Sequence, residues 1–188
     1  NSRGVYFKDT QLNPFSFKVK KIGEDVFAST ISGSNTINSL FENGASVKMP
    51  NAVVIGKNAF YNAIQLTNVE MENIQVVGEN AFEGCVALQT VEMPNATHIS
   101  KEAFYACTSL ETAIMPLVTH IEEGAFKNNI SLKTLEIPSV VNIGKEAFLE
   151  TNSLKTVKLP VVEEIWHRAF KGSAIEALNL PKATIIYN

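Results

Sequence analysis

Apolar and polar residues recur along the chain with a period of 22 residues from Val47 onward. Within each period, one short segment alternates apolar and polar side chains, as in Leu88–Met93, where Thr90 and Glu92 are polar. Since successive side chains of a strand point to opposite faces, this alternation predicts a half-buried β-strand. Pro94 follows and cannot donate a ladder hydrogen bond, so we expect the strand to end there.

The rest of each period predicts two further elements with inward-facing side chains. Ala96 and Ile99 indicate a second, shorter extended piece, and Lys101–Cys107 indicates one or two helical turns. In those turns Ala103 and Phe104 are expected to face the interior of the coil. A glycine or serine precedes the turn in most copies, as a tight bend favours; these residues are Gly56, Gly78, Ser100 and Gly144.

An Ala-Phe pair marks the period most clearly, and columns of proline, isoleucine or valine, and leucine keep the same spacing. One period cannot bury its apolar side chains alone, whereas stacked coils bury them in ladders about 4.8 Å apart. The periodicity therefore predicts a repeat solenoid built mainly from short parallel strands. The phenylalanine column consists of Phe60, Phe82, Phe104, Phe126, Phe148 and Phe170.

Residues 1–46 follow the period poorly, and we expect them to form an irregular N-terminal cap. Ile22–Phe27 matches the later pattern as one degenerate repeat, and two candidate short strands precede it. An inserted loop is expected at Ser29–Ser46, which contains Ser-Gly-Ser-Asn and Asn-Gly. Residues 47–188 are then the repeat array, with an incomplete last repeat.

Charge and composition exclude several function classes. The 16 basic and 19 acidic residues give a net charge of −3, so the chain lacks the basic surface of a nucleic-acid-binding protein. No apolar run approaches the roughly 20 residues of a membrane-spanning helix. No nucleophile–base set and no phosphate-binding loop is evident, so we expect neither an enzyme nor a bound cofactor.

Both ends of the chain suggest a longer natural protein. The chain starts at Asn1 without a signal peptide, and we expect that an upstream segment has been removed. Leu178–Pro181 begins another repeat before the chain stops at Asn188. Because an uncapped last coil exposes an apolar end, we expect either that the protein continues or that this end pairs with a second copy.

The repeat resembles that of the BspA-like leucine-rich repeat family. Leu132–Leu154 carries the pattern L-x-x-[VI]-x-[LIM]-P-x-x-x-x-I-G-x-x-A-F-x-x-C-x-x-L at nearly every marked position, with Thr151 in place of the cysteine. The resemblance implies a right-handed leucine-rich repeat superhelix of 22-residue coils, mainly β with short helical turns. It also implies a secreted or cell-surface protein with a role in adhesion, whose partner is a protein or a glycan.

The outward side chains of the predicted strands are the main candidates for ligand binding. They suggest a mildly acidic, concave binding face, although a solvated strand face of β-favouring threonines explains the same columns. In the middle of this face, Ile114 interrupts the glutamates and Leu117 replaces a polar residue, which suggests an apolar spot where interface energy concentrates. The candidate residues are Lys48, Glu70, Thr90, Glu92, Thr112, Ile114, Leu117, Thr134, Glu136 and Lys158.

His98 and His120 occupy one column, which continues with Asn142 and Glu164. Two histidines and a carboxylate suit transition metals. However, Glu164 would lie two coils beyond His120, roughly 10 Å away, so we expect surface histidines and no metal site.

Cys85 and Cys107 are also 22 residues apart and would stack. A disulfide is possible at coil spacing, but we favour buried free thiols because later coils place other small residues there. Trp166 replaces a glycine of other copies. It either anchors a partner or packs on the shortened last repeat.

Overall fold

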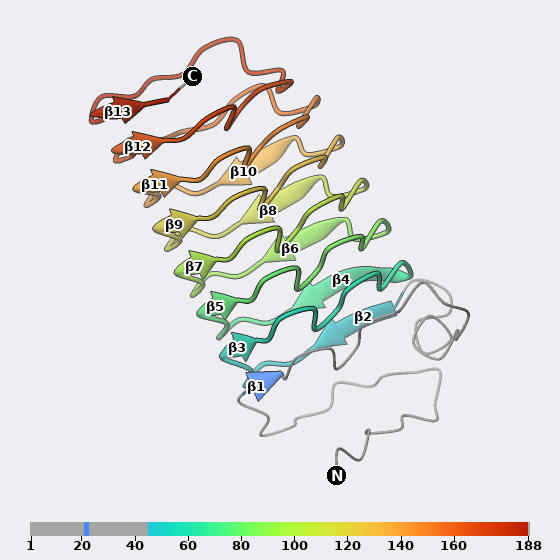
Figure 1. The fold of residues 1–188 in the computed structure, drawn as a ribbon. Coiled ribbons are helices and arrows are strands. Elements are labelled where there is room, and N and C mark those ends of the chain that lie inside the picture. Colours follow the sequence, from blue (N-terminus) through green and yellow to red (C-terminus); the bar gives the residue numbers. More distant parts are fainter. Residues whose placement is uncertain (1–20, 23–44, 188) are drawn as a thin grey trace, which may run out of the picture.

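The computed structural model describes residues 21–22 and 45–187, which form a β-solenoid of stacked coils (Figure 1). Each regular coil crosses two parallel sheets. The eight-stranded sheet consists of two-residue strands: β1 (Lys21–Ile22), β3 (Val54–Ile55), β5 (Val76–Val77), β7 (His98–Ile99), β9 (His120–Ile121), β11 (Asn142–Ile143), β12 (Glu164–Ile165) and β13 (Ile185–Ile186). The five-stranded sheet consists of β2 (Ala45–Lys48), β4 (Leu66–Glu70), β6 (Thr90–Glu92), β8 (Thr112–Ile114) and β10 (Thr134–Glu136).

The 22-residue period becomes the register of both sheets. Val91 pairs with Ala113 between β6 and β8, and Ile99 pairs with Ile121 between β7 and β9. At the N-terminal end, β1 adds Ile22 beside Ile55, in the column expected from the degenerate repeat. The two candidate strands near the N-terminus lie outside the described residues. Of the expected inserted loop, only residues 45–46 are described, and they belong to β2.

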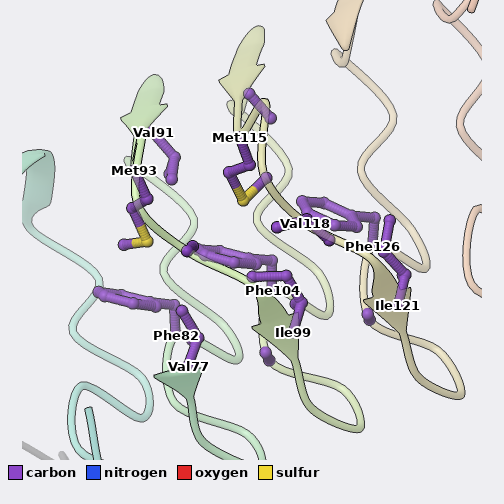
Figure 2. Packing of buried hydrophobic residues seen from close by; sticks show 14 of the residues in the cluster. Val77, Phe82, Val91, Met93, Ile99, Phe104, Met115, Val118, Ile121 and Phe126 are labelled. Atoms are coloured by element: carbon purple, nitrogen blue, oxygen red, sulfur yellow. The ribbon is translucent and has the colours of Figure 1, made fainter. Parts of the chain in front are cut away.

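The phenylalanine column forms the centre of the core. Neighbouring rings from Phe60 to Phe170 lie 4.9–5.4 Å apart between centroids, with interplanar angles of 1–12°. Figure 2 shows Phe82, Phe104 and Phe126 following one another through successive coils, with Ile99 and Met93 among the side chains packed around them. The other predicted inward residues, including Ala96 and Leu110, are fully buried as well.

The expected helical turns at Lys101–Cys107 are wrong, because the described residues contain no helix. Ala103 N–H donates to Ser100 O at 3.2 Å and closes a β-turn, in which Glu102 has a φ of 53°. The amides of residues 102, 104 and 106 donate instead to the next coil, at 2.8–2.9 Å. Since these amides bond between coils, a helical ladder within one coil cannot form.

The glycines that precede the turn serve a different purpose from the expected tight bend. Gly78 and Gly144 are absent from the residues with positive φ. A Cβ on Gly78 would lie 2.7 Å from the backbone carbon of Gly56, and one on Gly144 would lie 2.6 Å from that of Glu122. The close approach of neighbouring coils therefore favours glycine here. Positive φ occurs later in the turn, at Asn58 and Asn80 among others.

The two sheets differ at the C-terminal end of the array. The eight-stranded sheet continues from β11 through β12 and β13. The five-stranded sheet ends at β10, and the equivalent segment of the next coil, residues 155–159, is not a strand. Figure 1 shows no strand arrow beside β10 on its C-terminal side. No helix that could cross a membrane occurs in residues 21–22 and 45–187.

Candidate ligand-binding face

The outward residues of the five-stranded sheet form two columns, as the sequence predicts. Strand pairing places Thr90, Thr112 and Thr134 in one column. The second column contains Lys48, Glu70, Glu92, Ile114 and Glu136, each beside its neighbour in register. Eight of the ten candidate residues therefore lie in one continuous sheet, whereas Leu117 lies three residues after the end of β8 and Lys158 lies beyond β10.

The charges of the second column are balanced at one end only. Lys48 Nζ lies 2.6 Å from Glu70 Oε2, and both side chains are half exposed. The hydrogen bond to Glu70 raises the pKa of Lys48 above its usual value. At the other end the sheet stops at β10, and Lys158 makes no ion pair with a described residue.

Of the two residues predicted to form an apolar spot, Leu117 lies in the turn after β8 and Ile114 lies within the sheet. Its side chain is 48% exposed, whereas Ile114 is half-buried between its neighbours in the sheet. Glu92 and Glu136 flank Ile114 on the adjacent strands and are exposed. Ile114 is therefore an apolar interruption between two acidic side chains of the column.

A cleft of about 420 Å³ opens beside β10, where the five-stranded sheet ends. Residues 133–138 line one side of the cleft and residues 156–158 line the other. Sequence reasoning missed this feature because both sides follow the repeat pattern. One signal was present, since Lys133 and Lys155 are 22 residues apart and would bring like charges together in a closed sheet.

The histidine column is a surface feature with an unexpected partner. The rings of His98 and His120 lie 5.9 Å apart between centroids. His98 Nε2 lies 2.7 Å from Glu122 Oε1, and Glu122 Oε2 accepts a hydrogen bond from the Lys101 amide at 2.8 Å. Glu122, rather than Glu164, is thus the carboxylate beside the histidines. The described residues contain no group of three or more side chains suited to a metal ion.

Cys85 and Cys107 are buried free thiols, as predicted. Each thiol donates to a backbone carbonyl of the preceding coil at 3.1 Å, Cys85 to Phe60 O and Cys107 to Phe82 O. Burial raises the pKa of both thiols well above the usual value. Since the thiolate is the reactive form, neither cysteine is suited to nucleophilic chemistry.

Trp166 packs on the last repeat, which is one of the two interpretations that the sequence left open. Its side chain is 40% exposed, and its ring stacks on Tyr187 of the last coil at 4.7 Å. His167 stacks on the same tyrosine at 5.3 Å. The tryptophan therefore packs on the last repeat and still presents part of its ring to solvent.

Comparison with family models identifies the repeat. The model described as "BspA type Leucine rich repeat region (6 copies)" matches residues 4–111, 38–142 and 119–188. No curated protein matches the chain.

Three solved structures show the same fold. A leucine-rich cell surface protein of Faecalibacterium prausnitzii is 27% identical with a TM-score of 0.60, over 90% of this chain and 39% of that one. A leucine-rich repeat protein of Bacteroides ovatus is 24% identical with a TM-score of 0.59, over 76% of this chain and 44% of that one. One of T. pallidum is 23% identical with a TM-score of 0.59, over 90% and 67%. The chain thus spans less than half the length of the first two relatives.

Proposed function

Because the chain belongs to the BspA-type leucine-rich repeat family, we propose that it is an extracellular or cell-surface binding module. Its ligand is a protein or a glycan, and it acts in adhesion or partner recognition. A similar structure is named a cell surface protein, which supports this location. We propose no catalytic role and no cofactor, because the exposed columns contain no activated nucleophile.

The observation that carries the proposal is the face of the five-stranded sheet. Register aligns polar columns of threonine and glutamate around Ile114, and the exposed Leu117 follows β8 in the next turn. Interfaces concentrate their binding energy in such apolar centres, while a polar rim excludes water. The rigid stacking of the coils holds these side chains in place before a ligand arrives, which lowers the entropic cost of binding.

Substitution of Leu117 tests the proposal. The wild-type protein is screened against immobilised extracellular matrix proteins and a glycan array, and Leu117→Asp is compared for every ligand found. We expect a loss of affinity of at least ~10-fold, as for a central interface residue. Val86→Asp is the matched control, because Val86 is also an exposed apolar turn residue but is not one of the ten candidates. Equal binding by wild type and Leu117→Asp would contradict the proposed face.

A structural spacer is the alternative function. The two relatives of which this chain spans less than half are longer proteins, which suits a repeat segment that separates other parts. If the screen finds no saturable ligand for the wild type, the spacer function is favoured over the binding module.

A further inference from the structure

We propose that the cleft beside β10 binds an extended, acidic peptide segment of a partner protein as an added β-strand. The proposal rests on the binding function proposed above and deepens it by naming the form of the ligand. The segment would lie between β10 and residues 155–159, and it would place an acidic side chain between Lys133 and Lys155.

Backbone hydrogen bonding at the cleft differs from that at three of the four preceding coil boundaries, the exception being the Met71 amide after β4. The Met93 amide donates to Ile114 O at 3.0 Å, and the Met115 amide donates to Glu136 O at 2.9 Å. Ile137 occupies the next position of this series, yet its amide has no partner of this kind in the described part of the chain. An unpaired strand edge of this type is a template for another strand.

On the opposite side of the cleft, a backbone amide also lacks the inter-coil hydrogen bond of its counterparts. The Glu111 amide donates to Gln89 O at 2.9 Å, and the Lys133 amide donates to Glu111 O at 3.0 Å. The Lys155 amide, which is next in the series, makes no equivalent bond to Lys133 O within residues 45–187. Both sides therefore offer backbone groups to a strand inserted between them, with the amide of Ile137 on one side and that of Lys155 on the other.

The side chains inside the cleft suit a strand with alternating character. Leu135 and Val157 are the inward residues of the two sides, and both line the cleft. Val157 is half-buried, whereas its counterparts Val91 and Ala113 are fully buried. An apolar residue of the ligand between Leu135 and Val157 would complete this burial.

The charges at the cleft favour an acidic ligand residue. Lys133 Nζ already lies 3.0 Å from Glu111 Oε1 on one neighbouring coil. The corresponding residue on the other side is Lys155, which is exposed. Like charges opposite each other in a sheet are unfavourable, so direct closure of β10 onto residues 155–159 would bring two lysines together. A carboxylate between them converts this repulsion into two attractions.

The chain itself shows what sequence fits. The coil that precedes β10 places Glu111 beside Lys133 and Ala113 beside Leu135. The segment that contains them reads E-T-A-I-M. An acidic residue, a polar residue and then a small apolar residue is therefore the pattern expected of the ligand.

A labelled peptide tests the proposal on the whole chain. The probe carries E-T-A-I-M between glycines, with a fluorescent label, and its binding is followed by anisotropy up to ~1 mM. We expect saturable binding. The same peptide with alternate backbone amides methylated should bind at least ~10-fold more weakly, because strand addition depends on main-chain hydrogen bonds. Failure to saturate, or equal binding of the methylated peptide, would overturn the proposal.

Two variants test the role of charge. Lys155→Gln should weaken binding several-fold, because Lys155 directly precedes the lining residues 156–158. Lys145→Gln should not, because Lys145 is also exposed but follows β11 of the other sheet. Unchanged affinity of Lys155→Gln would contradict the acidic specificity.

Leu117→Asp leaves the cleft lining intact. If Leu117→Asp binds the peptide but no longer binds the screened ligand, both sites are supported. If the wild type binds the screened ligand but not the peptide, only the cleft proposal is rejected.

Discussion

The two sheets pass through the same coils but end differently. The eight-stranded sheet pairs Ile143 with Ile165 and Ile165 with Ile186, so its ladder crosses the last coils without a break. The five-stranded sheet stops at β10, and a cleft separates it from the next coil. A repeat period therefore aligns the coils, but each ladder closes only where its own side chains allow it.

The side chains of the two sheets differ at this boundary. The eight-stranded sheet has an uninterrupted column of isoleucine and valine, and the phenylalanine stack continues to Phe170, with 5.1 Å between the Phe148 and Phe170 rings. On the five-stranded side, closure would place Lys155 beside Lys133. In addition, the last repeat has five residues from Phe170 to Ile175, where other coils have six. The segment after Phe170 therefore cannot repeat the register that supports the earlier strands.

The largest expected effect separates the centre of the array from its last coils. Phe104 is fully buried between two stacked rings, so Phe104→Ala should lower the free energy of unfolding by about 3–5 kcal/mol. Phe170 is only partly buried, and Phe170→Ala should cost less than about 2 kcal/mol. Urea unfolding of both variants measures the difference. Equal losses would contradict a looser C-terminal region.

Amide exchange should show the unpaired edge directly. We expect the Ile137 amide to exchange at least ~100-fold faster than the Met115 amide, because only the latter has a hydrogen-bond partner in the next coil. Residue-resolved hydrogen exchange by NMR provides the comparison, with Met93 as a second protected reference. Strong protection of Ile137 in the free protein would show that the five-stranded sheet closes in solution.

Charge substitution should close the cleft. Lys155→Glu replaces a like pair across the cleft with an opposite pair, and we expect a gain in stability of roughly 0.2–1 kcal/mol. The amide of Ile137 should become protected at the same time. Lys158→Glu is the matched control, because it places a second carboxylate opposite Glu136 and should leave the cleft open. If both variants behave alike, charge does not determine the opening.

The smallest effect concerns an ion pair in the region where the ladders are complete. Lys127 Nζ lies 2.8 Å from Glu146 Oε2, and this hydrogen bond lowers the pKa of Glu146 below its usual value. The resulting stabilisation is present above the usual carboxyl pKa and is lost as pH falls through the lowered pKa. Glu146→Gln should therefore be less stable than wild type at pH 7, by less than about 1 kcal/mol, and this difference should shrink at pH 3.

A control variant isolates this effect. Glu176 is exposed and makes no ion pair with the described residues, so Glu176→Gln should leave the difference between pH 7 and pH 3 unchanged. Urea unfolding at the two pH values measures both variants. A stability difference between wild type and Glu146→Gln that stays the same at pH 3 would argue against the ion pair as its cause.

The sequence predicted the solenoid, the register and the core residues. Repeated inward positions such as Phe104, Ile99 and Val91 carry this information, because a coil of this length can bury them only by stacking in register. The same periodicity predicted that Cys85 and Cys107 are buried and that Glu92 and Ile114 lie side by side. These properties follow from spacing and polarity alone.

Only the tertiary structure decided the features that depend on contacts between coils. The turn at Lys101–Cys107 is not helical because its amides bond to the next coil, and a single repeat carries no signal of that preference. The contact of Glu122 with His98 likewise joins two neighbouring coils, so one repeat alone does not reveal it. The end of the five-stranded sheet is the clearest case, since residues 155–159 fit the repeat pattern. Their separation from β10 is seen only in the structure.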